Sequence, residues 1–465
     1  MAENFVGLLE ATARRHADRP ALVWREGTLS YAALERRAGG FARFLAHAGV
    51  RAGDRVALAI PNRWPFVAAL LGGLKLGATV VPLDPRLTAE EQGAILDDLR
   101  PRFVAHEVPG DEAAWPALPN VDAPALVLYT SGSTGRPKGA VLSHGALAFA
   151  IRSWADPVMA LTREDVVLGV LPFSHSFGLN GALLAPLFTG ATVVVLERFA
   201  PEEVIETIAT HHVTVFPGVA TMFRRVLGAP ALDRTALASL RLALSGAAPC
   251  PWDLACEWRD RTGVRILRGY GSTELFRPLS YLAADPTDVA DAVGRPVPGV
   301  EVRVVDDDAR ALPVGELGEL LIKTPAAMDG YLGASDETDE VLVDGWFRTG
   351  DLARVTPEGW VKIEGRKRER ILRGGYSVFP QEVEAVLLAH PAMAEAAVVG
   401  VPHGELGKEV TAFVALHAGH RADPEELIAY CKRQLAAFKY PRHITIVPEL
   451  PKAATGKILK KLLTR

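Results

Sequence analysis

Residues 129–139 combine four small hydroxyl side chains, three glycines and two cations within eleven positions. Glycines let backbone N–H groups approach an anion closely, hydroxyls donate to its oxygens, and Lys138 supplies positive charge. An apolar run at 125–128 leads into this stretch as a strand. It differs from a Walker A loop because no Gly-Lys-Ser/Thr sequence closes it. We interpret it as a phosphate-binding loop, with a plain polar surface loop as the alternative.

The residue order in this loop resembles the signature of the adenylate-forming superfamily of acyl- and aryl-CoA ligases, peptide-synthetase adenylation domains and luciferases. Six further segments resemble motifs of this family and follow the family's order. They read LPFSHSFG at 171–178, LSGAAP at 244–249, GYGSTE at 269–274, WFRTGD at 346–351, GRKRE at 365–369 and PKAATGK at 451–457. One such match arises easily by chance, but seven in order do not. The acyl-CoA ligases are the branch that the chain resembles most.

Length and composition describe a folded protein of several domains. A chain of 465 residues is too long for one ordinary core, and 49% hydrophobic with 23% charged residues excludes a disordered chain. A net charge of −4 gives no reason to expect nucleic acid as a partner. The three cysteines lack metal or disulfide spacing, and we see neither a secretory signal nor a membrane span. We therefore expect a cytoplasmic protein, as a monomer or homodimer.

Strand-like and helix-like segments alternate through the first 270 residues, which predicts an α/β fold with parallel sheets covered by helices. Beyond residue 297 the pattern indicates antiparallel strands, and after residue 365 a small α+β module. We expect a large N-terminal domain at 1–367, with βα sheets and a small barrel-like part, and a small mobile C-terminal domain at 368–465. The helices expected around the parallel strands lie at 64–76, 89–99, 201–211, 219–227 and 252–262.

The resemblance implies an ATP site, and the residue types suit it. Tyr270 would stack on adenine, and Asp351 would accept hydrogen bonds from both ribose hydroxyls. Thr273 would donate to phosphate, and the Glu274 carboxylate would hold Mg²⁺. Taken singly, each could be a core or turn residue. The implied nucleotide-binding set is Thr130, Ser131, Gly132, Ser133, Thr134, Gly135, Lys138, Gly246, Ala247, Ala248, Tyr270, Gly271, Ser272, Asp351 and Arg366.

The basic tail and the segment after residue 365 would supply the moving parts. Read alone, Lys457 belongs to a solvated basic face. Its motif instead implies the catalytic lysine, which bridges the acyl carboxylate and the α-phosphate. Arg368 stands at the family's hinge position. Gly374 and Gly375 would leave room for the CoA thiol, although Gly374 stands where many CoA ligases carry a lysine.

The acid would lie among apolar or small residues, which the resemblance places at His175, Phe216, Val219, Met222, Gly246, Gly269 and Leu275. Malonate-type relatives carry an arginine directly before the adenine-stacking tyrosine, where this chain has Gly269. We expect that glycine to leave a deep, uncharged pocket. The directions of the Arg268 and Arg277 side chains stay open.

These residues predict an AMP-forming acyl-CoA synthetase. It would use ATP, Mg²⁺ and coenzyme A, and act on a medium- or long-chain fatty acid or an aryl acid. The alternative is an adenylating enzyme that passes the acyl group to a carrier-protein thiol or to an amine. A nucleotide-binding scaffold without activity should lack Lys457, Glu274 or Asp351, but all three are present.

Overall fold

The computed structural model describes residues 4–109, 111–116, 123–130, 137–232, 235–285, 289–374, 376–452 and 458–463. The chain forms two compact units. The first comprises residues 1–302, 322–347 and 359–361, and the second comprises 303–321, 348–358 and 362–465. In the part of the chain that is described, no helix is both long and apolar enough to cross a membrane.

The first unit contains a seven-stranded sheet in the order β12-β11-β10-β8-β9-β1-β2. Neighbouring strands run parallel except β1 and β2, which form an antiparallel hairpin. The strands are β1 (Pro20–Trp24), β2 (Gly27–Ser30), β8 (Val166–Gly169), β9 (Thr192–Val195), β10 (Val215–Gly218), β11 (Leu242–Ser245) and β12 (Ile266–Leu267). The parallel arrangement confirms the sheet type predicted from strand–helix alternation.

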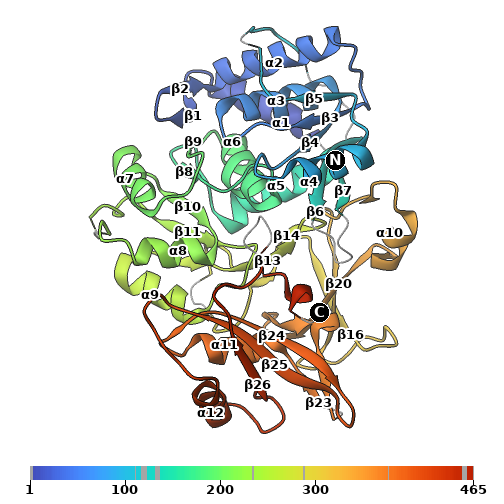
Figure 1. Cartoon of the computed structure of the whole chain (residues 1–465). Coiled ribbons are helices and arrows are strands. Elements are labelled where there is room, and N and C mark those ends of the chain that lie inside the picture. The colour runs from blue at the N-terminus through green and yellow to red at the C-terminus, as the bar shows by residue number, and fades with distance from the viewer. Residues whose placement is uncertain are drawn as a thin grey trace. The chain divides into compact units, whose positions relative to one another are not determined.

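Helices α7 (Pro201–His211), α8 (Ala220–Leu227) and α9 (Trp252–Thr262) pack beside β10 and β11 (Figure 1). Their apolar faces form one buried core cluster with the strands. Local signals set the helix ends: Pro201 starts α7, and Gly263 ends α9 with a left-handed φ of 80°. Further helical segments are α1 (Phe5–Arg15), α5 (His144–Ser153), η1 (Trp154–Val158), η2 (Gly178–Leu184) and α6 (Ala185–Thr189).

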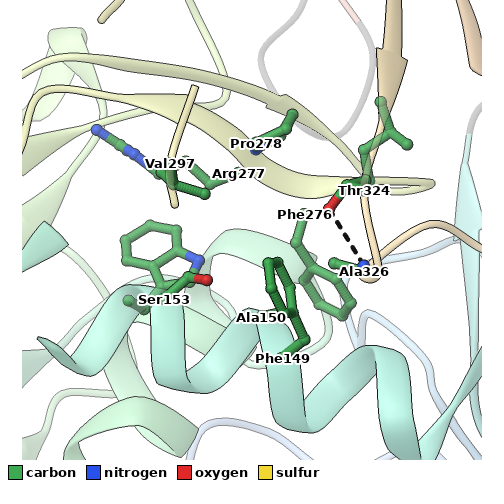
Figure 2. Close-up of a pocket in the computed structure, with 11 residues that line it drawn as sticks. Phe149, Ala150, Ser153, Phe276, Arg277, Pro278, Val297, Thr324 and Ala326 are labelled. Carbon is green, nitrogen blue, oxygen red and sulfur yellow. Dashed lines mark hydrogen bonds between the residues drawn. The ribbon is translucent and has the colours of Figure 1, made fainter. Parts of the chain in front are cut away.

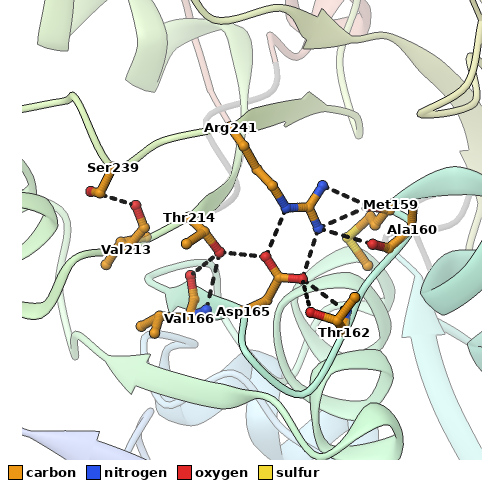
Figure 3. Close-up of polar contacts among 9 residues, drawn as sticks. All are labelled: Met159, Ala160, Thr162, Asp165, Val166, Val213, Thr214, Ser239 and Arg241. Atoms are coloured by element: carbon orange, nitrogen blue, oxygen red, sulfur yellow. Dashed lines mark hydrogen bonds and ion pairs between the residues drawn. The ribbon is translucent and has the colours of Figure 1, made fainter.

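A partly buried polar network joins the amino ends of three strands of this sheet (Figure 3). Asp165 precedes β8, and its carboxylate accepts two hydrogen bonds from Arg241, at 2.7 and 2.9 Å. Thr214, which precedes β10, donates to Asp165 Oδ1 at 2.6 Å. Burial alone would raise the pKa of Asp165, but the bonds from Arg241 and Thr214 hold it below its ordinary value. These hydrogen bonds therefore fix the amino ends of β8, β10 and β11 relative to one another. The candidate site lies at the opposite, carboxyl ends of the strands.

The second sheet of this unit has six strands in the order β18-β7-β6-β4-β3-β5. Its strands are β3 (Arg55–Leu58), β4 (Thr79–Pro82), β5 (Phe103–Ala105), β6 (Pro124–Thr130), β7 (Lys138–Ser143) and β18 (Gly330–Tyr331). The strands β3 to β6 pair in parallel, whereas β7 and β18 add antiparallel edges. Its helices are α2 (Tyr31–His47), the almost fully buried α3 (Trp64–Leu76), and α4 (Ala89–Leu99).

Three short strands form a separate antiparallel sheet, β13 (Gly269–Ser272), β14 (Phe276–Ser280) and β15 (Arg295–Pro296). The apolar residues at 264–268 predict a strand there, with residues 269–274 directly after it. Instead β12 has only two residues, and Gly269–Ser272 is itself a strand. Pairing with β14 is the reason, because it supplies backbone partners that the apolar pattern does not reveal. Thr273 and Glu274 lie in the turn between β13 and β14.

Five strands beyond residue 297 form a further sheet, in which β19 and β20 pair antiparallel. They are β16 (Glu301–Val305), β17 (Gly318–Lys323), β19 (Leu342–Val343), β20 (Trp346–Val355) and β21 (Val361–Arg366), with helix α10 (Ser335–Val341). The C-terminal module has a sheet of β22 (Ile371–Arg373), β23 (Tyr376–Val378), β24 (Met393–His403), β25 (Gly407–Leu416) and β26 (His443–Ile446). Helices α11 (Pro380–Leu388) and α12 (Pro424–Gln434) share a buried core with it (Figure 1). Short 3₁₀ turns are η3 (Lys367–Glu369) and η4 (Lys460–Leu462).

Candidate functional site

The predicted phosphate-binding loop joins two antiparallel strands. Thr130 ends β6 and is paired with Lys138, which begins β7. The residues between them that we assigned to phosphate lie outside the described residues: Ser131, Gly132, Ser133, Thr134 and Gly135. The pairing of Thr130 with Lys138 fixes where the chain leaves β6 and enters β7, two inner strands of the six-stranded sheet.

Strand β18 brings Lys138 and Glu274 close to one tyrosine. Because β18 pairs with β7, Tyr331 lies opposite Ala140. The Tyr331 hydroxyl donates to Glu274 Oε1 at 2.8 Å, and the Lys138 ammonium lies 5.2 Å from the centre of the Tyr331 ring. Lys138 also pairs with Glu337 of α10. The cation predicted for phosphate and the carboxylate predicted for Mg²⁺ therefore belong to one cluster.

Sequence reasoning missed Tyr331, because a lone Gly-Tyr pair shows no strand periodicity. Burial first, and then the Glu274 carboxylate, raise the pKa of the Tyr331 phenol. The phenol therefore stays protonated at neutral pH and acts as the hydrogen-bond donor. It holds one oxygen of Glu274 in place, which is a positioning role.

The carboxyl edge of the seven-stranded sheet gathers the residues predicted for adenine and acid. Directly after β11, Gly246 is buried and Ala247 and Ala248 are exposed, and Val219 follows β10. Tyr270, Gly271 and Ser272 lie in β13, which begins two residues after β12. A Cβ at Gly271 would overlap the carbonyl oxygen of Phe276, so glycine is required there. Open α/β sheets bind ligands at this edge.

The predicted acid-binding residues differ in what their side chains can reach. Phe216 is fully buried, with its ring centre 5.0 Å from Phe223, so it can only support a pocket from behind. Met222 also packs against this core. His175 is exposed to solvent. Leu275 is buried beside a cavity of about 10 Å³, which has room for about one water.

The deep, uncharged pocket expected behind Gly269 is not what the described side chains form. A Cβ at Gly269 would overlap the guanidinium of Arg277, and a Cβ at Gly246 would lie 3.2 Å from Arg277 Nη1. Arg277 also lines the small cavity with Phe149 and Phe276 (Figure 2). The expectation was wrong because the arginine reaches the glycines from the neighbouring strand β14.

The second unit holds the two residues predicted for ribose. Asp351 lies in β20 and is 3% exposed, and its Oδ1 pairs with Arg366 Nε at 2.8 Å. The Asp351 N–H donates to Thr349 Oγ1 at 3.0 Å, and Thr349 itself is anchored to Leu320. The structure thus brings Asp351 and Arg366 together on β20 and β21. Arg366 orients the carboxylate that we expect to bind ribose.

The buried carboxylate of Glu319, on β17, forms ion pairs with two cations that lie near Asp351 and Arg366 in the sequence. It bonds to Arg348 at 2.8 Å and to Lys367 at 3.0 Å. Burial alone would raise the pKa of Glu319, but these two cations hold it below its ordinary value. The ionised carboxylate therefore stabilises the folded state above its ordinary pKa, and that stabilisation is lost as pH falls through the lower, folded pKa.

Glu319→Gln should therefore lower the free energy of unfolding by about 1.5–3 kcal/mol at pH 7, the range for hydrogen bonds to charged groups. The deficit should be smaller at pH 3 than at pH 7, because it shrinks as the pH falls from the ordinary pKa of glutamate, 4.5, toward the lower folded pKa of Glu319. Denaturant titrations at both pH values measure this, with the exposed Glu316→Gln as the matched control. An equal deficit at both pH values would contradict the electrostatic account.

The remaining predicted residues lie in the C-terminal module. Arg368 is exposed in η3, directly after β21. Gly374 has a left-handed φ of 54° in the tight turn between β22 and β23, while Gly375 lies outside the described residues. Lys457 also lies outside them, and its neighbours Lys452 and Ile458 form an antiparallel bridge. The described residues hold no cluster of three His, Cys, Asp or Glu side chains suited to a metal.

Family models match both parts of the chain. The model described as AMP-binding enzyme matches residues 9–121 and 105–332, and the model of its C-terminal domain matches residues 382–457. The chain belongs to the AMP-binding enzyme family. This AMP-binding enzyme is therefore a member of the adenylate-forming superfamily, as its motifs predicted.

Relatives of this AMP-binding enzyme are named CoA ligases, so it is a ligase of this family. A feruloyl-CoA synthase of Amycolatopsis is 36% identical and covers 97% of this chain and 94% of that protein. A long-chain-fatty-acid–CoA ligase of Escherichia coli is 30% identical, covering 99% and 94%. ATP-bound MatB from Rhodopseudomonas palustris has a TM-score of 0.93 at 31% identity over 100% and 98%. A benzoate CoA ligase from Burkholderia xenovorans has a TM-score of 0.89 at 31% identity, and the match covers 99% of this chain and 100% of that chain.

Proposed function

We propose that this AMP-binding enzyme activates a carboxylic acid with ATP and transfers the acyl group to coenzyme A. In the first step a carboxylate oxygen bonds to the α-phosphorus and pyrophosphate leaves. In the second step the CoA thiol loses its proton and bonds to the acyl carbon, and AMP leaves. The observation that carries the proposal is the cluster of Lys138, Tyr331 and Glu274, which joins a phosphate loop to a held carboxylate.

The described residues fit Mg²⁺ as the metal. This ion usually takes one or two protein carboxylates and completes its shell with waters and phosphate oxygens. Glu274 offers one such carboxylate, held by Tyr331 and with a second oxygen to spare. When bound, the ion would offset charge on the ATP phosphates. Lys138 supplies a further positive charge, for which the phosphates would compete with Glu337.

Aryl acids suit the described pocket better than long-chain fatty acids. Arg277 fills the space beside Gly246 and Gly269, and the cavity behind Leu275 has room for about one water. A compact, flat body needs less depth than a medium or long alkyl chain. Relatives named feruloyl-CoA synthase and benzoate CoA ligase support this choice.

The acceptor and the moving domain are part of the same proposal. Relatives named CoA ligases support coenzyme A over a carrier-protein thiol or an amine. In the proposed cycle the C-terminal domain, from residue 368, rotates about Arg368. One orientation brings Lys457 to ATP, and the other brings the Gly374–Gly375 turn to the thiol.

Product analysis tests the function. Purified enzyme with ATP, Mg²⁺ and a panel of aryl and aliphatic acids should release pyrophosphate, and added CoA should give the thioester and AMP. Release of ADP and phosphate would contradict the proposal, because a different phosphate bond would have been cut. Pyrophosphate with thioester formed only on a carrier-protein thiol would favour the alternative acceptor.

A further inference from the structure

Arg277 is a buried cation for which no anionic partner is present among the described residues. Its side chain, on β14, is almost completely buried. Nε donates to Ser280 Oγ at 3.0 Å, Nη1 to the Ser245 carbonyl at 2.9 Å, and Nη2 to the Leu267 carbonyl at 3.1 Å. These acceptors are neutral, and a guanidinium has five N–H donors. The charge is therefore only partly compensated where it lies.

The aromatic neighbour of Arg277 is also a donor in need of an acceptor. The guanidinium carbon lies 5.0 Å from the centre of the Trp154 ring. In the described part of the chain, the buried Nε1 of Trp154 has no hydrogen-bond partner. Both side chains line the small cavity beside β14, and Figure 2 shows Arg277 at this cavity. This region offers N–H groups and a positive charge, and burial of unmatched polar groups is costly.

Gly246 and Gly269 connect this cation to the candidate acid site. The guanidinium contacts both positions, which border the acid in the proposed function. Burial lowers the pKa of Arg277 to about 9, which leaves the side chain protonated at neutral pH. An acid bordered by these two glycines, as in the proposed function, would therefore lie near a positive charge.

We propose that Arg277 selects carboxylic acids that carry an oxygen acceptor at the end remote from the reacting carboxyl. A second carboxylate should be preferred over a carbonyl as that acceptor. The inference rests on the proposed function and specifies its substrate class. An oxygen acceptor there would pair with the spare N–H groups of Arg277. A site built around such donors discriminates strongly against a hydrocarbon analogue, because that analogue leaves them unpaired.

A purely structural role is the competing explanation, since Arg277 ties β14 to the residues at the ends of β11 and β12. That role predicts an equal loss for all acids when Arg277 is replaced. Selection predicts an unequal loss. The experiment must therefore compare matched acids within each variant.

The test measures kcat/KM for pyrophosphate release with terephthalate, 4-acetylbenzoate and 4-isopropylbenzoate, and with suberate against nonanoate. Wild type should prefer the oxygenated member of a pair by about 10–100-fold, the range for one hydrogen bond to a charged group. In Arg277→Met the ratio of the two kcat/KM values should fall to about one. Arg277→Lys should keep a preference for the acid with the second carboxylate. A wild-type preference for the hydrocarbon acids, or ratios unchanged in Arg277→Met, would overturn the proposal.

Calorimetric titration of the same acids, with thermal unfolding of each variant, keeps the inference separate from the proposed function. Binding that favours oxygenated acids through Arg277, without pyrophosphate release, would support the selection and contradict the ligase chemistry. Pyrophosphate release without a binding or kinetic preference for oxygenated acids would support the ligase chemistry and contradict selection by Arg277. If Arg277→Met does not fold, the Arg277→Lys comparison decides the matter.

Discussion

Lys457→Ala is expected to lose the first half-reaction and keep the second. Charge builds on the α-phosphate as the carboxylate attacks, and the proposed position of the ammonium is beside that charge. Removal of one preorganised charge-stabilising group typically costs about 10²–10³ in rate. The variant should therefore form acyl-adenylate at least about 10²-fold more slowly, yet convert supplied acyl-adenylate to thioester at a near-normal rate. Single-turnover assays of each step measure both rates.

Two further variants complete this test. Lys461→Ala, an exposed lysine four residues away, removes the same charge from the tail and should leave both steps unchanged. Arg368→Pro should impair the second step more than the first, because a fixed φ at the hinge hinders rotation. Equal losses in both steps for Lys457→Ala and Arg368→Pro would indicate one rigid site, and the two-orientation cycle would be wrong.

The helices that sequence predicted well are those whose ends carry their own signals. Helix α9 begins and ends as expected at 252–262, because Gly263 adopts the left-handed cap. Helix α4 also matches, because Thr88 and Glu91 form a capping box. Such signals lie within a few residues of the boundary, so one sequence suffices to read them.

Elements defined by a distant partner were harder to predict. Gly269–Ser272 has no apolar alternation and becomes β13 only through pairing with β14. Tyr331 reaches Glu274 because β18 pairs with β7, almost two hundred residues earlier in the chain. The motif residues Glu274 and Lys138 were identifiable by resemblance, but the side chain that connects them was not.

Side-chain direction decides which residues of the predicted acid pocket could face a ligand. Phe216 and Val219 are near neighbours in sequence, but only Phe216 is enclosed by the core. Arg277 was visible in the sequence, yet its approach to Gly269 depends on the bulged register between β13 and β14. A shift of one residue in that register would turn the side chain to the other face. The charge of the pocket therefore could not be read from residue types alone.

Asp351→Ala should weaken ATP binding by about 10²-fold or more. The proposed role is to accept hydrogen bonds from both ribose hydroxyls, and each bond to a charged acceptor contributes about 1.5–3 kcal/mol. The carboxylate is already held in place by Arg366 at 2.8 Å and by its backbone bond to Thr349. The Asp351 side chain is therefore already ordered before ATP binds, so binding loses little side-chain entropy there. Equilibrium binding of ATP to the variant measures the loss, with the exposed Asp308→Ala as control.

The partnership with Arg366 adds a sharper test. Arg366→Ala should weaken ATP binding partly by freeing the Asp351 carboxylate, so the two single losses overlap. The double variant should then lose less than the sum of the two, with a coupling of about 0.5–3 kcal/mol for residues in contact. Strictly additive losses would show that Arg366 acts on ATP without positioning Asp351. Unchanged ATP binding in Asp351→Ala would contradict the proposed ribose contact, and β20 would then not belong to the nucleotide site.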